Sequence, residues 1–229
     1  ITYDTTSSGS SVCPNTSTQT VDIALAGIAN NYSMNFDSAS SDYIDAGTGI
    51  GDSIGDSYTG DITVSMWFNL NTGTSSAGLM QIGGSGTGFG EIDIYKFSSG
   101  LRIKLGTSGN NNLLVTFPSL GSWHNLTFVY KGGSNSITNS KIYIDGAEVT
   151  PTASGSWSGT LNLAGKKTFI GLISSSYLMN GKLDELAIWN TALTSAQVQS
   201  IYDAKGTNLT KDLTTVSGSN LKYWNRMGD

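Results

Sequence analysis

The chain has one cysteine, one histidine and few charges among its 229 residues. A lone Cys13 cannot form an internal disulfide, so stability must come from the core, a metal ion or assembly. No cysteine or carboxylate lies near His124 in the sequence, which argues against a zinc site or a Ser-His-Asp triad. A net charge of −5 excludes nucleic acid as a main partner. No apolar run reaches the roughly 18 residues of a membrane span.

Glycine, in contrast, is abundant, with 29 residues, and Ser, Thr and Asn recur throughout. This composition is typical of many short strands joined by polar turns. Since sandwiches often exceed 200 residues, we expect one large domain. Residues 1–20 are small, polar and aperiodic, which predicts a leader or linker. The sandwich is expected at 21–206, with a C-terminal extension at 207–229.

Alternating apolar residues predict the strands. In residues 61–70 the apolar side chains fall on every second position and Trp67 points the other way, which is the pattern of a strand with one buried face. Residues 123–131 and 141–149 repeat it, and the Asp145-Gly146 pair within the latter predicts a two-residue hairpin turn. Further candidate strands are YSMNF, GLMQIG, EIDIYKF, LRIKLG, LLVTF, KTFIGL and KLDELAIW. We therefore predict an all-β, two-sheet antiparallel sandwich.

One short helix is expected at residues 194–205. Thr194 and Gln197 have the spacing of a capping box, and Gly206 follows as a stop signal. Val198, Ile201 and Tyr202 lie at helical spacing, so this helix should pack on the sandwich through a narrow apolar stripe.

The order of these segments resembles the laminin G-like branch of the concanavalin A-like lectin and glucanase superfamily. The match covers roughly residues 32–204 and is carried by YSMNFDSASSDYIDAG, ITVSMWFNL, GSWHNLTFVYKGG, KIYIDGAEV and FIGLISSSYLMNGKLDELAIWNTALTSAQVQSIY. The resemblance implies a jelly roll in which Trp123 and Trp189 are buried and His124 is a strand residue without chemistry.

The C-terminal LKYWNRMGD resembles the lead-in that precedes the first strand of many such domains in tandem arrays. This suggests a piece of a larger surface or virion protein, with 207–229 leading into a further module. The expected location is extracellular, at a cell surface or on a virion.

A glucanase-like motif occurs at Glu91-Ile92-Asp93-Ile94-Tyr95. Laminarinases and carrageenases of this superfamily carry a similar E-I-D-I segment ending in a proton-donating carboxyl. Here Tyr95 takes that position, and a phenol is a poor general acid for a sugar leaving group. We predict an ordinary strand with Ile92 and Ile94 inward, and no glycosidase or lyase activity.

Two non-enzymatic functions remain open. The first is recognition of a glycan or glycoprotein, for which Trp157 and Tyr177, each in a polar loop, are the predicted contact residues because aromatic rings in Ser- and Gly-rich loops suit ligand contact. Burial of Trp157 under its own loop is the structural alternative. The second function is assembly, in which the module decorates a particle, builds a fibre or contacts neighbouring subunits.

A structural calcium ion is the predicted cofactor. In the resembled family calcium often joins the regions that here contain Asp37 and Asp184. Calcium takes six to eight oxygen ligands, so Asp42 or carbonyls of residues 38–42 would have to complete the shell.

Overall fold

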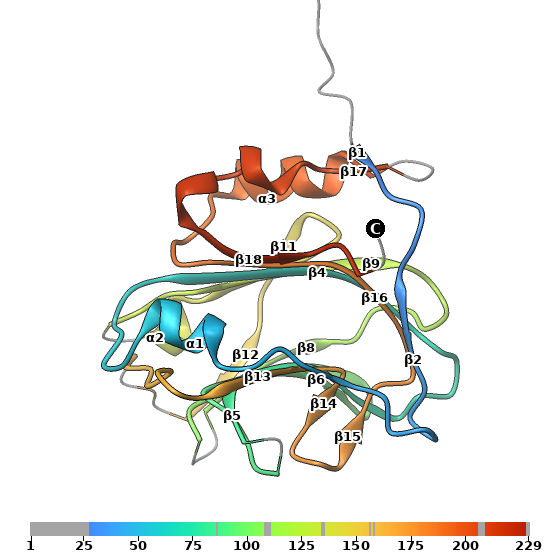
Figure 1. The fold of residues 1–229 in the computed structure, drawn as a ribbon, viewed down its shortest axis with the longest axis horizontal. Helices are drawn as coiled ribbons and strands as arrows, with labels where there is room; N and C mark the ends of the chain where they lie inside the picture. Colours follow the sequence, from blue (N-terminus) through green and yellow to red (C-terminus); the bar gives the residue numbers. More distant parts are fainter. Residues whose placement is uncertain are drawn as a thin grey trace, which may run out of the picture.

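The structure is a computed structural model that describes residues 28–85, 87–107, 111–133, 136–155, 157, 159–205 and 209–227. The predicted leader at 1–20, with Cys13, and the predicted stop at Gly206 lie outside these residues. Two seven-stranded antiparallel sheets pack face to face and form the sandwich (Figure 1). The all-β fold predicted from the alternation of apolar residues is confirmed.

The first sheet has the strand order β11-β10-β9-β4-β16-β18, with β2 also paired to β16. Its strands are β2 (Met34–Phe36), β4 (Ile62–Leu70), β9 (His124–Tyr130), β10 (Lys141–Ile144), β11 (Ala147–Val149), β16 (Gly181–Trp189) and β18 (Leu221–Asn225).

The second sheet has the order β12-β8-β7-β6-β5-β13-β3. Its strands are β3 (Ile44–Asp45), β5 (Ser76–Gly84), β6 (Ile92–Phe97), β7 (Gly100–Leu105), β8 (Asn112–Thr116), β12 (Thr152–Ser154) and β13 (Lys167–Ile170).

Two small ladders and a few helices complete the described residues. The ladders join β1 (Ile28–Ala29) to β17 (Leu209–Thr210), and β14 (Leu172–Ile173) to β15 (Tyr177–Leu178). The helices are α1 (Gly49–Ile54), α2 (Ser136–Asn139), α3 (Ser195–Asp203) and the 3-10 turns η1 (Leu213–Thr215) and η2 (Gly218–Asn220). Within the described ranges, no helix has the length and apolar character to cross a membrane.

One apolar core fills the space between the sheets. The alternating side chains of β4 are all buried in it, and those of β6 and β7 meet them from the second sheet. Burial of each large aliphatic or aromatic side chain contributes about 1.5–3 kcal/mol, so this shared face is the main source of stability. The residues from β4 are Ile62, Val64, Met66, Phe68 and Leu70.

Helix α3 covers the outer face of the first sheet (Figure 1). The predicted capping box is confirmed, because Thr194 accepts from the Gln197 backbone and the Gln197 side chain accepts in return. Val198 and Ile201 are buried against this sheet, and Tyr202 stacks on Trp67 with ring centroids 5.8 Å apart. The outward Trp67 thus serves as a docking surface for the helix.

The C-terminal segment corrects the predicted domain boundary. The sandwich continues past residue 206, because β18 pairs antiparallel with β16 and completes the first sheet. Trp189 on β16 is fully buried, as predicted, and its Nε1 donates to the Val216 carbonyl at 2.7 Å. The burial predicted for Trp123 is wrong: 40% of it is exposed, since it precedes β9 in a turn.

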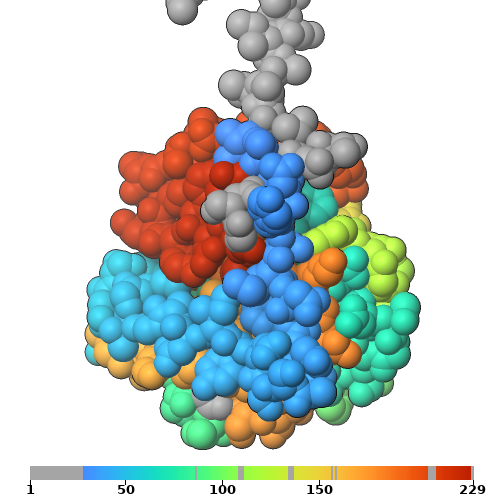
Figure 2. All heavy atoms as spheres, turned by 45° about the vertical axis from the view of Figure 1, so that its right-hand side comes forward, coloured from blue at the N-terminus to red at the C-terminus, as the bar shows by residue number. Residues whose placement is uncertain are grey.

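A buried polar junction joins the two ends of the described chain. β2 and β18 both pair with one edge of β16. On the other edge, the ladder between β16 and β4 shifts register between Asp184 and Ala187. In the space-filling view, the blue N-terminal segment lies beside the red C-terminal segment (Figure 2). Glu185 occupies the irregular position with a φ of 50°, a conformation that L-residues seldom adopt.

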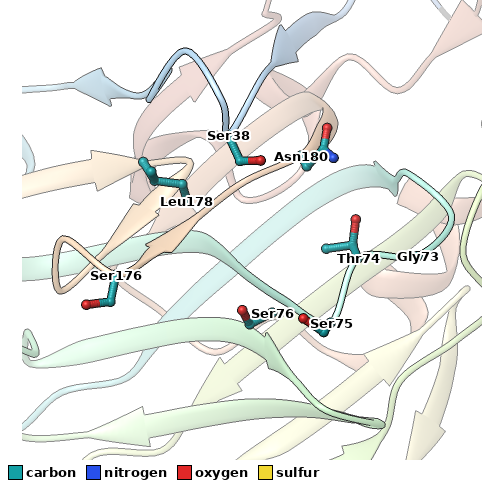
Figure 3. Close-up of a pocket in the computed structure, with 8 residues that line it drawn as sticks. All are labelled: Ser38, Gly73, Thr74, Ser75, Ser76, Ser176, Leu178 and Asn180. Carbon is teal, nitrogen blue, oxygen red and sulfur yellow. The ribbon is translucent and has the colours of Figure 1, made fainter.

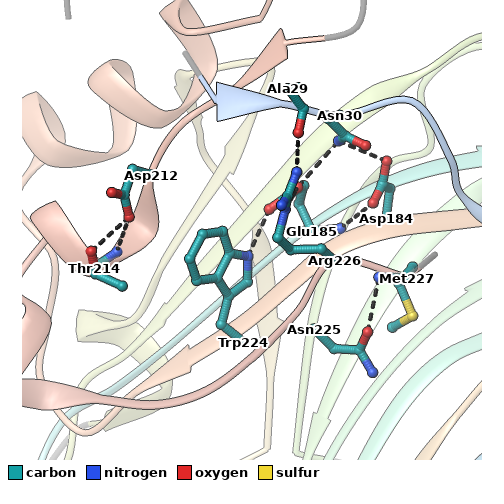
Figure 4. A network of polar contacts seen from close by, with 10 residues as sticks. All are labelled: Ala29, Asn30, Asp184, Glu185, Asp212, Thr214, Trp224, Asn225, Arg226 and Met227. Atoms are coloured by element: carbon teal, nitrogen blue, oxygen red, sulfur yellow. Dashed lines mark hydrogen bonds and ion pairs between the residues drawn. The ribbon is translucent and has the colours of Figure 1, made fainter. Parts of the chain in front are cut away.

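Three donors converge on the Glu185 carboxylate (Figure 4). Asn30 Nδ2 donates at 3.1 Å, Trp224 Nε1 at 2.6 Å and Arg226 Nε at 3.5 Å. Asn30 also donates to Asp184 at 2.9 Å, and Arg226 to the Ala29 carbonyl. The junction therefore holds the segment after β1 and the end of β18 on the bulge of β16.

A close backbone contact holds the β14–β15 hairpin on the outer face of the second sheet. At Gly78 of β5, a Cβ atom would lie 2.5 Å from the Tyr177 carbonyl oxygen and 2.7 Å from the Ile173 nitrogen. Both are backbone atoms that cannot rotate away. Only glycine at this position lets the hairpin lie directly on the sheet.

The Gly78→Ala substitution should therefore displace the hairpin and lower the melting temperature. Overpacking of this kind costs about 1–3 kcal/mol, which corresponds to about 2–10 °C for a domain of this size. Calorimetry measures the melting temperature of the variant and of the wild type. Gly49→Ala is the matched control because a Cβ there meets no atom within 4 Å; equal melting temperatures for the two variants would contradict the proposed contact.

Glu185 should make stability depend on pH. Burial raises the pKa of this carboxyl from 4.5 to about 7, and the Trp224 hydrogen bond offsets part of the rise. A folded-state pKa above the unfolded value gives a contribution that is complete below about pH 4.5 and is lost as the pH rises towards 7.

The free energy of unfolding of the wild type, relative to Glu185→Gln, should therefore be larger at pH 5 than at pH 8 by on the order of 1–3 kcal/mol. Urea titrations at the two pH values measure this difference. Glu148→Gln is the control, because this carboxyl is exposed and Lys141 lowers its pKa. A difference that is the same at both pH values would rule out the titration of Glu185.

Candidate functional site

The outward face of the second sheet carries the polar and aromatic side chains of β6 and β7. Ile92 and Ile94 point into the core, as predicted, so Asp93, Tyr95 and Phe97 point outward. One part of this face is covered by the loop between β5 and β6 and by the β14–β15 hairpin. The other part is open, and the two parts differ in chemistry.

The carboxylates of the glucanase-like motif lie in the covered part. Glu91 is almost fully buried and pairs with Lys166, with Nζ 2.7 Å from Oε1. Asp93 has no exposed surface and accepts from Gln81 Nε2 at 2.9 Å and the Gly90 amide at 3.0 Å. Burial raises the pKa of Asp93 to about 6, partly offset by these hydrogen bonds. Both carboxylates are thus already engaged by protein donors.

Lys104 lies opposite Asp93 in the ladder between β6 and β7. Its Nζ lies 4.7 Å from the centre of the Phe89 ring and donates to the Gly106 carbonyl. Burial lowers the pKa of this lysine, and Asp93 opposes the shift. In the covered part, the charged side chains of Glu91, Asp93 and Lys104 therefore all have partners within the protein.

The open part is a groove of about 400 Å³ at the other end of β6 and β7, called here the Phe97 groove. The Phe97 ring is 42% exposed in it, and the Arg102 side chain lies over that ring, with Cζ 5.1 Å from its centroid. Serine and threonine hydroxyls complete the walls. The groove is lined by Phe97, Ser98, Ser99, Gly100, Arg102, Leu114, Val115, Thr116, Thr150 and Thr152.

Tyr177 lies beside the Phe97 groove, at the tip of the hairpin that packs on Gly78. Its ring centroid is 5.3 Å from that of Tyr95 and 6.2 Å from that of Phe97. Arg102 also lies over Tyr95, with Cζ 5.8 Å from the ring centroid. Three aromatic rings and one guanidinium therefore form a continuous cluster, in which Tyr95 is buried, and the predicted Tyr177 lies at the border of the groove.

A second groove, of about 340 Å³, lies on the other side of the same hairpin. Its lining offers hydroxyl and amide groups but no aromatic ring and no charge (Figure 3). The Thr74 hydroxyl is buried there without a hydrogen-bond partner among the described residues. The lining residues are Ser38, Gly73, Thr74, Ser75, Ser76, Ser176, Leu178 and Asn180.

Trp157 lies away from both grooves. Its ring packs on the core and against Gly106, beyond the end of β7, whereas the Phe97 groove lies at the start of that strand. Its Nε1 donates to the Tyr130 hydroxyl at 3.2 Å. This placement gives Trp157 a structural role at the edge of the sandwich, and its role in ligand binding stays a prediction.

The three predicted calcium ligands are not brought together. Asp37 and Asp42 share one loop, where Asp42 accepts from the Asp37 amide and Asp37 from the Ala39 amide. Asp184 lies in the polar junction, and the ladder between β2 and β16 separates it from Asp37 by four positions, roughly 13 Å. Within the described ranges, no three metal-binding side chains cluster. Asp37 and Asp42 thus make the hydrogen bonds of a turn, and Asp184 those of the polar junction. Asp37 and Asp184 are too far apart to bind one calcium ion together, and calcium binding itself stays a prediction.

His124 has partners that its sequence neighbourhood does not reveal. The hairpin between β10 and β11 brings Asp145 Oδ2 to 2.7 Å from Nδ1, and Ser119 places its hydroxyl 2.9 Å and its carbonyl 3.1 Å from Nε2. The order is that of a nucleophilic triad. However, the imidazole also faces a backbone carbonyl, and none of these residues lines either groove. These hydrogen bonds join the turn before β9 to the β10–β11 hairpin through His124, which is a structural role.

Comparisons with solved structures show the fold. A candidate carbohydrate-binding protein from Bacteroides ovatus ATCC 8483 matches with a TM-score of 0.60 at 15% identity, over 88% of this chain and 53% of that one. The binding domain of botulinum neurotoxin serotype G matches with 0.53 at 13%, over 76% and 44%. The receptor-binding domain of botulinum neurotoxin mosaic serotype C/D matches with 0.54 at 11%, over 78% and 45%. The chain thus spans about half the length of these structures.

Sequence comparison assigns the family. No curated protein matches the chain. A family model described as the concanavalin A-like lectin/glucanases superfamily matches residues 15–199, which is most of the chain and includes both sheets up to α3. Together with the two-sheet topology, this match shows that the chain belongs to the laminin G-like family of the concanavalin A-like lectin/glucanases superfamily.

Proposed function

We propose that the chain is a non-catalytic carbohydrate-binding module and that the Phe97 groove is its ligand site. The observation that carries this proposal is the exposed Phe97 ring on the open part of the second sheet, with hydroxyl groups around it. A sugar presents C–H groups on one face, which pack on an aromatic ring, and hydroxyls at its edge, which need polar partners. The groove offers both.

The aromatic cluster supports the proposal because it holds the ring in place. Phe97 contacts Tyr177 edge-on and carries Arg102 above it. A ring that is fixed before binding loses little conformational entropy when a ligand packs on it. Tyr177 therefore acts mainly as a wall that positions Phe97, a smaller role than the direct contact expected from sequence.

The covered carboxylates support a module without catalysis. A retaining glycosidase needs two carboxyl groups open to the substrate and roughly 5–5.5 Å apart. Here Glu91 pairs with Lys166, and Asp93 lies below the β5–β6 loop. Among the residues that the structure describes, no carboxylate lines the open groove. The surface that could reach a sugar and the residues that could cleave one are therefore separate.

The known proteins of similar fold point the same way. One is a candidate carbohydrate-binding protein, and two are receptor-binding or binding domains of neurotoxins. We propose a glycan, free or on a glycoprotein, as the partner of this chain. An extracellular, cell-surface or virion location, and an additional role in assembly, stay predictions.

Phe97→Ala should weaken glycan binding several-fold, because stacking on an aromatic ring contributes on the order of 1 kcal/mol. A glycan array probed with wild type and variant measures this loss. Since the ring is partly exposed, the melting temperature should change little. Tyr32→Ala is the matched control, because Tyr32 is 66% exposed and lies outside the groove. Equal glycan binding by wild type and Phe97→Ala would remove the groove from this account.

A further inference from the structure

Arg102 differs from the lysines on and beside the second sheet, whose Nζ atoms each have a carboxylate or carbonyl partner. Lys96, for example, donates to the Ser75 and Ser98 carbonyls. Lys166 pairs with Glu91 at 2.7 Å and Lys167 with Asp45 at 2.6 Å. Lys104 donates to a backbone carbonyl beside the buried Asp93. Across the described parts of the chain, no carboxylate forms an ion pair with Arg102, and its buried Nε has no hydrogen-bond partner. The protein leaves this one guanidinium without a counter-charge.

A partly buried charge without a counter-ion has an energetic cost. The protein offsets part of it by placing the guanidinium over the Phe97 and Tyr95 rings, whose faces attract cations. The guanidinium also hydrogen-bonds the Tyr95 side chain, but neither this phenol nor the rings supply a negative charge, and the buried Nε stays without a partner. An anionic group in the groove would supply the missing counter-charge, and a guanidinium binds planar or tetrahedral oxyanions with two parallel hydrogen bonds.

The position of Arg102 decides where such an anion would lie. The side chain is part of the Phe97 groove wall, together with Thr116 and Thr152. A sugar ring on Phe97 would therefore place a substituent at its edge within reach of both the guanidinium and these hydroxyls. The overall charge of −5 does not attract anions over long distances, so any preference for them has to arise locally.

We infer that the ligand of the Phe97 groove is an acidic saccharide, whose carboxylate or sulfate group pairs with Arg102. This inference rests on the proposed function and specifies the class of glycan. Neutral glycans would pack on Phe97 and bond to the hydroxyls but leave the guanidinium without a counter-charge. The groove should therefore rank carboxylated or sulfated glycans above their neutral counterparts.

A glycan array with neutral, carboxylated and sulfated oligosaccharides tests this, probed with wild type, Arg102→Gln and Lys182→Gln. Lys182 is the matched control, an exposed lysine on β16 of the other sheet. We expect wild type to bind acidic members best. Arg102→Gln should reduce that binding at least tenfold, whereas Lys182→Gln should not change it. Higher salt should weaken the acidic binding of the wild type.

The outcomes separate this inference from the proposed function. Binding to neutral glycans only would overturn the acidic class and keep the glycan site. Acidic binding that Arg102→Gln leaves unchanged while Phe97→Ala removes it would overturn the pairing with Arg102 and keep the glycan site. No binding to any member of the array would overturn the proposed function and the inference with it. Signals confined to carboxylated or to sulfated members identify which anion the guanidinium pairs with.

Discussion

The proposed ligand surface depends on one steric constraint, the close backbone approach at Gly78. The β14–β15 hairpin lies on the outer face of the second sheet only because β5 has no side chain there. Its position divides that face: Tyr177 meets Tyr95 and Phe97 on one side, and the hydroxyl-lined groove opens on the other. Without this contact, the aromatic rings would lose the wall that holds them.

The two parts of the outer face of the second sheet differ in how their charged side chains are paired. In the covered part, each charged group meets a partner: Glu91 meets Lys166, and Asp93 meets Gln81 and the Gly90 amide. In the open part, Arg102 lies over aromatic rings, and no carboxylate of the described residues pairs with it. Balanced charges contribute to the stability of the fold, whereas an unbalanced one is free to contribute to recognition. This contrast is the physical basis for placing the ligand in the open part.

Local patterns in the sequence predicted the central strands and helix α3, but not the short helices α1 and α2 or the pairing of β18 with β16. Alternation placed the core side chains of β4, the capping box placed the start of α3, and Asp145-Gly146 placed a hairpin. The family resemblance pointed to the sandwich, but it assigned burial to Trp123, which the turn before β9 exposes.

The site could not be predicted because it depends on contacts between distant segments. Phe97 looks in sequence like the end of an ordinary strand, and only the packing of the hairpin and the absence of a carboxylate beside Arg102 distinguish it. For Trp157 the sequence left ligand contact and burial under its own loop both open. In the structure its indole donates to the hydroxyl of Tyr130, which lies 27 positions earlier in the chain. In the same way, Asp184 accepts a hydrogen bond from Asn30, 154 positions earlier in the chain. It lies apart from Asp37, with which it was predicted to share a calcium ion.

The most direct test of the account is a titration of the isotope-labelled protein with a glycan that it binds, followed by amide NMR. Binding in the Phe97 groove should give the largest shifts at residues 97–100, 102 and 114–116, which line it, while the amides around Trp157 stay unchanged. Shifts centred on the Trp157 loop, or on the groove between Ser38 and Asn180, would contradict it.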